Sequence, residues 1–321
     1  MKYKTLIVGL GQVAFGYDIN SLNENVVLSH ARAFATHPAF VLIGGVDPSE
    51  QQCAKFSKIY NCDAGSDLIS ILKQTAPEVV VIAAPTSQHG KLLKMVLEHV
   101  NPLAILCEKP LSYDLEEAQS IVKLCHEHNC LLYVNYLRRT EPGAQEIKRR
   151  LKNGRIAKPL KGVVWYTKGL LHNGSHFTNL LEYWLGRVIS FKVISVGKTQ
   201  GSLDSEPDVQ LSFADCTVTL LAARKENFSF HEIDLISPNG RLRYQQGGTK
   251  ITWQQAVPDP LFEGYNVLSQ TEEEIPSESE RAQWHVADQL AACLNGCTSD
   301  LCSGVDALQS LELLTKIRAA S

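Results

Sequence analysis

No apolar stretch in this 321-residue sequence approaches the roughly 20 residues that span a bilayer. No run of basic residues exceeds three, and the formal net charge is only −3. The sequence therefore lacks the electrostatic footprint of a protein that binds nucleic acid or an anionic membrane. Internal repeats and low-complexity segments are absent too. These absences indicate that its partners are small molecules or copies of itself.

Cysteine is not scarce, but it follows no metal-binding pattern. The nine cysteines include no CxxC pair, and their odd number does not suit a complete disulfide framework. The tightest cluster, Cys293, Cys297 and Cys302, has two interpretations, a metal site or free thiols in a reducing compartment. We expect free thiols and no metal. The N-terminal residues enter a predicted strand without a secretory signal, which predicts a cytoplasmic protein.

Short apolar runs alternate with amphipathic stretches in the first part of the chain, as expected of a parallel sheet with helices on both faces. The predicted strands are residues 5–9, 40–46, 78–84, 103–107 and 130–134, and residues 114–128 are a predicted helix. The pattern predicts an α/β domain over residues 1–138, a doubly wound parallel sheet of the Rossmann type.

After residue 138 strands follow strands, which predicts an α+β domain with a large, mostly antiparallel open sheet over residues 139–321. The predicted strands are residues 160–167, 188–197, 209–213, 218–223, 228–236 and 241–244. We expect a surface excursion over 255–280, helices over 281–295 and 304–319, and the last helix packed back on the first domain. A sheet with one bare face exposes apolar area, so we expect a homodimer or homotetramer through it.

The first predicted strand runs into Gly9-Leu-Gly11-Gln12-Val13-Ala14, a G-x-G-x-x-A motif. Its small residues allow a tight turn and close approach of a pyrophosphate. The alternative is a turn without a ligand. Because the motif follows a buried first strand, the context favours a dinucleotide site with contacts from Gly9, Gly11, Gln12 and Val13.

The second strand ends at Asp47, where a carboxylate would accept hydrogen bonds from the adenosine ribose. A carboxylate there would repel a 2′-phosphate, so we expect NAD rather than NADP. The alternative is a surface carboxylate in an Asp-Pro turn. Asp47 follows the glycine loop at an unusually long spacing, because residues 16–27 are an insertion before a helix that restarts near Ser29.

Glu108-Lys109-Pro110 closes a buried strand and places a lysine at the sheet edge where ligands bind in open α/β sheets. Oxidising an alcohol requires a base within hydrogen-bonding reach of the hydroxyl. Burial and a positively charged nicotinamide ring would both lower the pKa of a lysine toward neutrality. Lys109 is therefore the candidate base, the alternative being a solvated surface lysine.

Four segments resemble the glucose-fructose oxidoreductase and inositol dehydrogenase family, Gfo/Idh/MocA. They are the glycine loop, Ala83-Ala-Pro-Thr-Ser-Gln-His89, Cys107-Glu-Lys-Pro-Leu111 and Gly169-Leu-Leu-His-Asn-Gly-Ser-His176. The resemblance covers nearly the whole chain. It implies an NAD(P)-dependent dehydrogenase or reductase acting on CH–OH groups, whose second domain offers its sheet to substrate and to a neighbouring subunit.

The resemblance also implies roles for individual residues. Lys109 matches the family lysine that contacts nicotinamide and the reacting hydroxyl, and His176 matches the histidine of the substrate domain. Further cofactor contacts are implied for Pro85, Thr86, His89 and Glu108, and substrate contacts for Arg139, His172, Asn173 and Asn179. His172 and Asn179 stand where many members have aspartate, so we expect a less acidic site around Lys109.

His176 begins an amphipathic helix that we expect Asn173 or Ser175 to cap. A helix N-terminus disfavours the imidazolium, so a neutral His176 would bond a substrate hydroxyl or share its proton with Lys109. The alternative is a core histidine. The His172/His176 spacing also suits zinc, but no Glu follows as in H-E-x-x-H, and a second polar contact to substrate fits better.

Two functions remain open from the sequence. The first is an NAD-dependent oxidoreductase acting on a sugar, cyclitol or nucleotide-linked sugar. The second is a non-catalytic NAD-binding sensor of the same fold, which the loss of both aspartates favours and the retention of Lys109 and His176 opposes.

Overall fold

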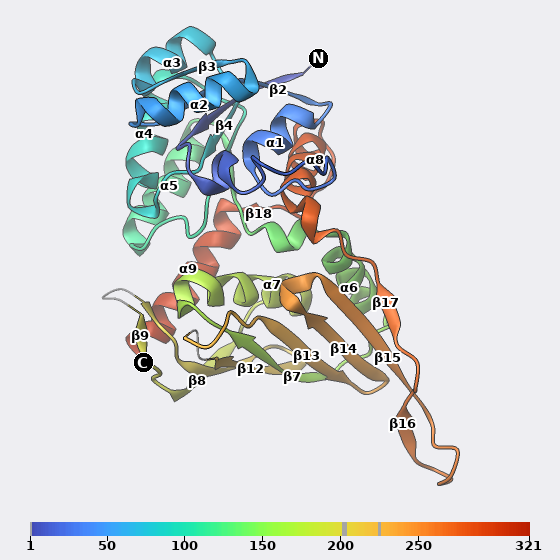
Figure 1. Cartoon of the computed structure of the whole chain (residues 1–321). Coiled ribbons are helices and arrows are strands. Elements are labelled where there is room, and N and C mark those ends of the chain that lie inside the picture. The colour runs from blue at the N-terminus through green and yellow to red at the C-terminus, as the bar shows by residue number, and fades with distance from the viewer. Residues whose placement is uncertain (1, 201–203, 224–225) are drawn as a thin grey trace. The chain divides into compact units, whose positions relative to one another are not determined.

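The computed structural model describes residues 2–200, 204–223 and 226–321 (Figure 1). The chain divides into two compact units. Unit 1 comprises Met1–Thr140 and Glu280–Gln309, and unit 2 comprises Glu141–Ser279 and Ser310–Ser321. Within the described ranges, no helix is both long enough and apolar enough to cross a membrane.

A seven-stranded sheet lies at the centre of the described part of unit 1, in the order β18-β6-β5-β4-β1-β2-β3. All its strands pair in parallel except β18, which pairs antiparallel with β6. The strands are β1 (Tyr3–Val8), β2 (Phe40–Val46), β3 (Asp63–Gly65), β4 (Val79–Ile82), β5 (Ala104–Cys107), β6 (Leu131–Val134) and β18 (Cys302–Ser303). The predicted doubly wound sheet is confirmed. The two strands that were not predicted, β3 and β18, are too short to carry a hydrophobic pattern.

Four of the helices of unit 1 begin at side-chain caps. The helices of this unit are α1 (His30–Thr36), α2 (Glu50–Tyr60), α3 (Leu68–Thr75), α4 (His89–His99), α5 (Leu115–Glu127) and α8 (Ala282–Leu294). Ser29, Ser49, Asp67 and Asp114 each accept a hydrogen bond from a first-turn backbone N–H. Val286 and Leu290 of α8 join the same core as Phe34 of α1. A distant segment thus completes the first core.

The insertion predicted over residues 16–27 lies between β1 and α1, which begins at His30. Asp18 is 2% exposed and accepts hydrogen bonds from Leu28 N (2.8 Å), Ser29 N (2.9 Å) and Ser29 Oγ (2.6 Å). Arg32 donates to the carbonyls of Asp18, Ser21 and Asn23 at 2.9–3.2 Å. The segment is therefore fastened to the start of α1.

Unit 2 is built on a larger sheet in the order β16-β15-β14-β13-β7-β12-β11-β8, with β17 also paired to β15. Its strands are β7 (Leu160–Tyr166), β8 (Ser190–Ser195), β11 (Asp208–Ser212), β12 (Cys216–Ala222), β13 (Glu232–Ser237), β14 (Gly240–Gln245), β15 (Lys250–Pro258), β16 (Asn266–Leu268) and β17 (Glu273–Ile275). Among the described strands of this sheet, only β7 and β12 pair in parallel. The predicted mostly antiparallel sheet is confirmed, and β9 (Thr199–Gln200) with β10 (Asp204–Ser205) adds a separate two-stranded ribbon.

The expected surface excursion over 255–280 is only partly correct. β15 extends to Pro258, and β16 and β17 pair back on it, so this region belongs to the sheet edge. β16 and β17 are each only three residues long, so the turn signals around them outweighed any strand pattern in the prediction. The part of β15 that extends past β14 pairs with β16, and the two form a protruding ribbon (Figure 1).

Helices α6 (Pro142–Lys152) and α7 (Ser175–Leu185) cover one face of this sheet (Figure 1). Trp184 of α7 donates from Nε1 to Ala144 O at 2.9 Å and meets Tyr244 of β14 edge to face. On the opposite face, Trp165 and Ile236 are 37% and 52% exposed. The last helix, α9 (Gly304–Ala319), runs from residues assigned to unit 1 into residues assigned to unit 2.

Candidate functional site

The glycine loop leaves β1 at a position that only glycine fits. Gly9 has φ +91°, and a Cβ there would lie 2.6 Å from Ala84 N. Gly11 is extended, and nothing lies within 4 Å of where its Cβ would be. A single π-helical turn, Gln12–Gly16, follows. The loop therefore packs against the end of β4 on one side and leaves room for a phosphate group on the other.

A cavity of about 940 Å³ opens beside this loop, and all its lining residues belong to unit 1. Six of the predicted cofactor contacts line it: Gly9, Gly11, Gln12, Val13, Asp47 and Pro85. The wall opposite the loop comes from residues 66–69 and from α4. Leu68, Leu92 and Met95 were not predicted as contacts, and they supply an apolar surface suited to an aromatic base.

Asp47 is held rigidly at the edge of the cavity. Its Oδ2 accepts from Leu10 N at 2.8 Å, and its Oδ1 accepts from Ser49 N at 2.9 Å. Each carboxylate oxygen keeps a lone pair for a further donor. The residue is thus more than a turn carboxylate, because it connects the glycine loop to the end of β2.

Lys109 emerges at the same sheet edge as the glycine loop. β1, β4 and β5 are neighbours and parallel, and the backbone continues their pairing where Ala83 N donates to Val8 O and Glu108 N donates to Ile82 O. The carboxyl ends of these strands are where ligands bind in such sheets. Lys109 does not line the cavity around Asp47, so the two predicted features occupy different parts of the edge.

Glu108, whose side chain is 13% exposed, lies in a hydrogen-bonded cluster. Its Oε1 lies 2.8 Å from Nε2 of His30 and accepts from Nδ2 of Asn135 at 2.7 Å. Burial acts to raise the pKa of Glu108, but the hydrogen bonds from His30 and Asn135 and the charges of His30 and Lys109 outweigh it, so the pKa is lowered. Glu108 is therefore a carboxylate, and it lies outside the cavity lining.

His89 is fully buried and faces backbone rather than the cavity. Its Nδ1 lies 3.1 Å from Leu111 O and its Nε2 lies 2.9 Å from Ala84 O. It ties the end of β4 to the loop after Pro110. Neither His89 nor Thr86 lines the cavity, so the structure gives no support for direct cofactor contacts from them.

Arg139 lies in a short 3₁₀ turn of unit 1, is 7% exposed, and forms an ion pair with Asp306 (3.2 Å between Nη1 and Oδ2). Asn179 of α7 is fully buried in unit 2 and donates from Nδ2 to Ser310 Oγ at 3.1 Å. Ser310 in turn donates to Glu182. Both predicted substrate contacts thus have structural partners.

The start of α7 differs from the prediction. A π-helical turn, Gly169–Gly174, leads directly into α7, and neither Asn173 nor Ser175 caps the helix. Instead, Asp204 of β10 accepts from Leu171 N at 2.9 Å and from His172 N at 3.0 Å. Burial raises the pKa of Asp204, while these backbone hydrogen bonds oppose the rise.

Glu206 accepts from Gly169 N at 3.0 Å and is 4% exposed. Two carboxylates missed in the sequence therefore hold the turn that carries His172. The replacement of the two aspartates by His172 and Asn179 does not leave this turn without acidic groups. No sequence signal identified Asp204 and Glu206, because they come from a segment with no motif.

His231 is a further polar residue of this region that the sequence did not reveal. Its Nε2 lies 3.0 Å from both Asn173 Nδ2 and Thr167 Oγ1, and its ring stacks on Phe177. His172 is exposed and His176 partly buried. In the described part of the chain, no group of histidine, cysteine and acidic residues is arranged to hold a metal ion.

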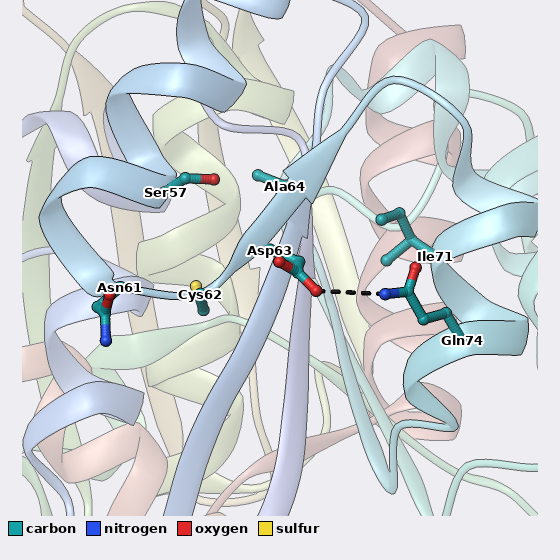
Figure 2. Close-up of a pocket in the computed structure, with 7 residues that line it drawn as sticks. All are labelled: Ser57, Asn61, Cys62, Asp63, Ala64, Ile71 and Gln74. Atoms are coloured by element: carbon teal, nitrogen blue, oxygen red, sulfur yellow. Dashed lines mark hydrogen bonds between the residues drawn. The ribbon is translucent and has the colours of Figure 1, made fainter.

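A second pocket, of about 550 Å³, lies at the β3 edge of unit 1. Figure 2 shows its lining residues, Ser57, Asn61, Cys62, Asp63, Ala64, Ile71 and Gln74. Asp63 accepts from Gln74 at 3.3 Å, and burial raises the pKa of Cys62 to about 11. A thiol with this pKa is a poor nucleophile at neutral pH. None of the predicted site residues lines this pocket.

Residues 3–136 match the family model described as an oxidoreductase family with an NAD-binding Rossmann fold. The scyllo-inositol 2-dehydrogenase (NAD(+)) of Bacillus subtilis is 29% identical over 133 residues, which cover 41% of this chain and 38% of that protein. The D-xylose 1-dehydrogenase [NADP(+)] of Haloarcula marismortui is 34% identical over 85 residues, 26% of this chain and 23% of that protein. The matched segments thus span well under half of these curated relatives.

Among solved structures, the WlbA dehydrogenase of Bordetella pertussis, in complex with NADH and UDP-GlcNAcA, superposes with a TM-score of 0.77. The superposition covers 99% of this chain and 95% of that chain at 19% identity. At this level of identity the likeness establishes the two-domain fold.

Proposed function

Because residues 3–136 match the family model of oxidoreductases with an NAD-binding Rossmann fold, we propose that this chain is a Gfo/Idh/MocA enzyme, an NAD-dependent dehydrogenase or reductase. Its substrate would be a secondary hydroxyl or keto group of a sugar, cyclitol or nucleotide-linked sugar. Relatives and structural neighbours named as inositol, xylose and UDP-sugar dehydrogenases support this class.

The observation that carries the proposal is the sheet edge of unit 1. The glycine loop, with open space over Gly11, and the fixed carboxylate of Asp47 fit a dinucleotide. When bound, NAD⁺ supplies the hydride acceptor. Asp47 would accept hydrogen bonds from the adenosine ribose, and Gly11 would leave space for the pyrophosphate. A 2′-phosphate would meet the negative charge of Asp47, so we propose NAD over NADP.

Proton transfer is assigned to the Lys109 Nζ, which would take the hydroxyl proton as the hydride leaves carbon. His176, in unit 2, would hydrogen-bond and orient a substrate hydroxyl. Asn173 and His172 would contact other substrate hydroxyls from the turn that Asp204 holds. Arg139, paired with Asp306, and Asn179, bonded to Ser310, would contact the substrate at the margin of its site.

Fluorescence titration with NADH and NADPH, followed by a panel of sugars, cyclitols and nucleotide sugars, tests this function. Lys109→Ala should abolish reduction of NAD⁺ while leaving the Kd for NADH within about tenfold. Lys123→Ala, an exposed lysine of α5 paired with Glu127, is the matched control and should retain turnover. Equal turnover in Lys109→Ala would remove the assigned role. Tight NADH binding without turnover on any substrate would instead support the sensor function.

We also propose a cytoplasmic homodimer or homotetramer. The described structure contains nine free cysteines, which suits a reducing compartment. Trp165 and Ile236 project from the face of the unit 2 sheet that the helices leave bare, and an apolar face of this kind favours self-association. Sedimentation velocity at micromolar concentration checks the assembly, and a monomer would contradict it.

A further inference from the structure

His30 has no role in the proposed reaction as described so far, although it contacts a neighbour of Lys109. It is the first residue of α1 and is 1% exposed. Its Nε2 lies 2.8 Å from Oε1 of Glu108, the residue that precedes Lys109. Nothing in the sequence singled it out, because the contact joins residues 78 positions apart.

The proton on Nε2 of His30 follows from its partner. Glu108 is a carboxylate with a lowered pKa, so it can only accept hydrogen bonds. Nε2 of His30 therefore carries a proton and donates. Asn135 donates to the same oxygen at 2.7 Å and also lies 3.3 Å from Oε1 of Gln283. Two donors thus fix the orientation of one largely buried carboxylate.

The fixed carboxylate reaches the backbone of Lys109. Oε2 of Glu108 accepts from Lys109 N at 3.3 Å, and Glu108 N donates to Ile82 O at 2.9 Å. The backbone on both sides of the Glu108 Cα is therefore held, by the strand through Glu108 N and by the carboxylate through Lys109 N. A buried carboxylate that loses a donor must turn toward water or take up a proton. Either change would release Lys109 N.

We infer that His30 is a positioning residue for Lys109, acting through the Glu108 carboxylate. This rests on the proposed function, because it assigns His30 a part in proton transfer by Lys109. His30 is absent from the lining of the dinucleotide cavity. The effect of removing it should therefore fall on kcat and leave NADH affinity unchanged.

Three variants test this inference. In His30→Gln, the side-chain amide replaces the Nε2–H donor. His30→Asn carries the same amide on a shorter chain that does not reach Glu108, and His30→Leu removes the donor. We expect kcat to fall about 10- to 100-fold in His30→Leu and His30→Asn, the loss of one hydrogen bond to a charged group. We expect His30→Gln to stay within about threefold of the native kcat, and all three to bind NADH normally.

A double mutant separates positioning from general destabilisation. If His30 acts only through Lys109, His30→Leu should add nothing to the loss in Lys109→Ala. Additive losses, or a His30→Gln variant as impaired as His30→Asn, would overturn the inference. Should His30→Leu fail to fold, the pair of amide variants gives the same comparison.

A second measurement, which needs no substrate, distinguishes failure of the His30 inference from failure of the proposed function. The rate at which Lys109 is reductively methylated, measured by mass spectrometry relative to Lys123 in the same molecule, reports the placement of Lys109 without any substrate. A protein that turns over nothing would contradict the proposed function alone. We expect His30→Leu and His30→Asn to change the Lys109 rate at least threefold and His30→Gln to preserve it. Equal rates in all variants would refute the inference.

Discussion

Replacing Asp47 with asparagine should weaken the preference for NAD over NADP. The amide oxygen can still accept from Leu10 N, now 2.8 Å from the carboxylate, so the glycine loop keeps its connection to β2. The Ser49 N–H, which would face the amide NH₂, lies at the surface and can bond water. The variant therefore removes charge with little change in shape.

The expected magnitude follows from two effects. A phosphate charge about 5 Å from a carboxylate at an effective dielectric of about 20 is repelled by roughly 3 kcal/mol, and solvent at this part-exposed site reduces this to about 2. Loss of a ribose hydrogen bond to a charged acceptor costs NAD about 1–2 kcal/mol. Together these change the ratio of the two Kd values by about 3–4 kcal/mol, or roughly 10²- to 10³-fold.

Calorimetric titration of the native protein and the variant with NAD⁺ and NADP⁺ measures this ratio. Asp63→Asn, which removes the same charge from the pocket at the β3 edge, is the control for net charge and should leave the ratio unchanged. An Asp47→Asn variant with the native ratio would refute the assignment of Asp47 to the ribose. A native protein that prefers NADP⁺ would refute it as well.

Two further predictions concern unit 2. Gly169→Ala should destabilise it by about 3–5 kcal/mol, because φ is +86° and the new Cβ would overlap Asp204. Gly154→Ala, with φ +77° and open space around the new Cβ, should cost only about 1 kcal/mol. Urea unfolding of the two variants measures both free energies. Hydrogen bonding to Arg149, against the opposing effect of burial, lowers the pKa of Glu146 from 4.5 to about 2. Its stabilising contribution is therefore complete above pH 4.5 and lost as the pH falls toward 2, and Glu146→Gln should flatten thermal stability over this window; an unchanged pH profile would contradict it.

The fold was readable from the sequence wherever an element is long enough to carry a pattern. β2 and α5 were predicted within a few residues, because one is a continuous apolar run and the other has a regular buried face that follows Asp114. The strands β3 and β17 were missed, because pairing with a neighbour determines them and their own residues do not.

The site divides in the same way. The glycine loop and Asp47 were predicted from a motif with a local cause, the close approach of backbone to phosphate. Asp204 and His231 were not predicted. Asp204 comes from the β9–β10 ribbon and His231 from the segment just before β13, and only the folded chain brings them to the turn at residues 169–174. The cap of α7 was assigned to the wrong residues for this reason.

The inserted segment before α1 has a consequence for the architecture of the dinucleotide domain. Asp18 joins the two ends of the segment by accepting from Ser29 N, and Arg32 donates to carbonyls within it. Leu22, at the tip of the segment, is 99% exposed. The length of this loop can therefore change at the tip without altering the glycine turn before it or the start of α1 after it. Leu22 is accordingly a natural attachment point for a fluorophore or an affinity tag.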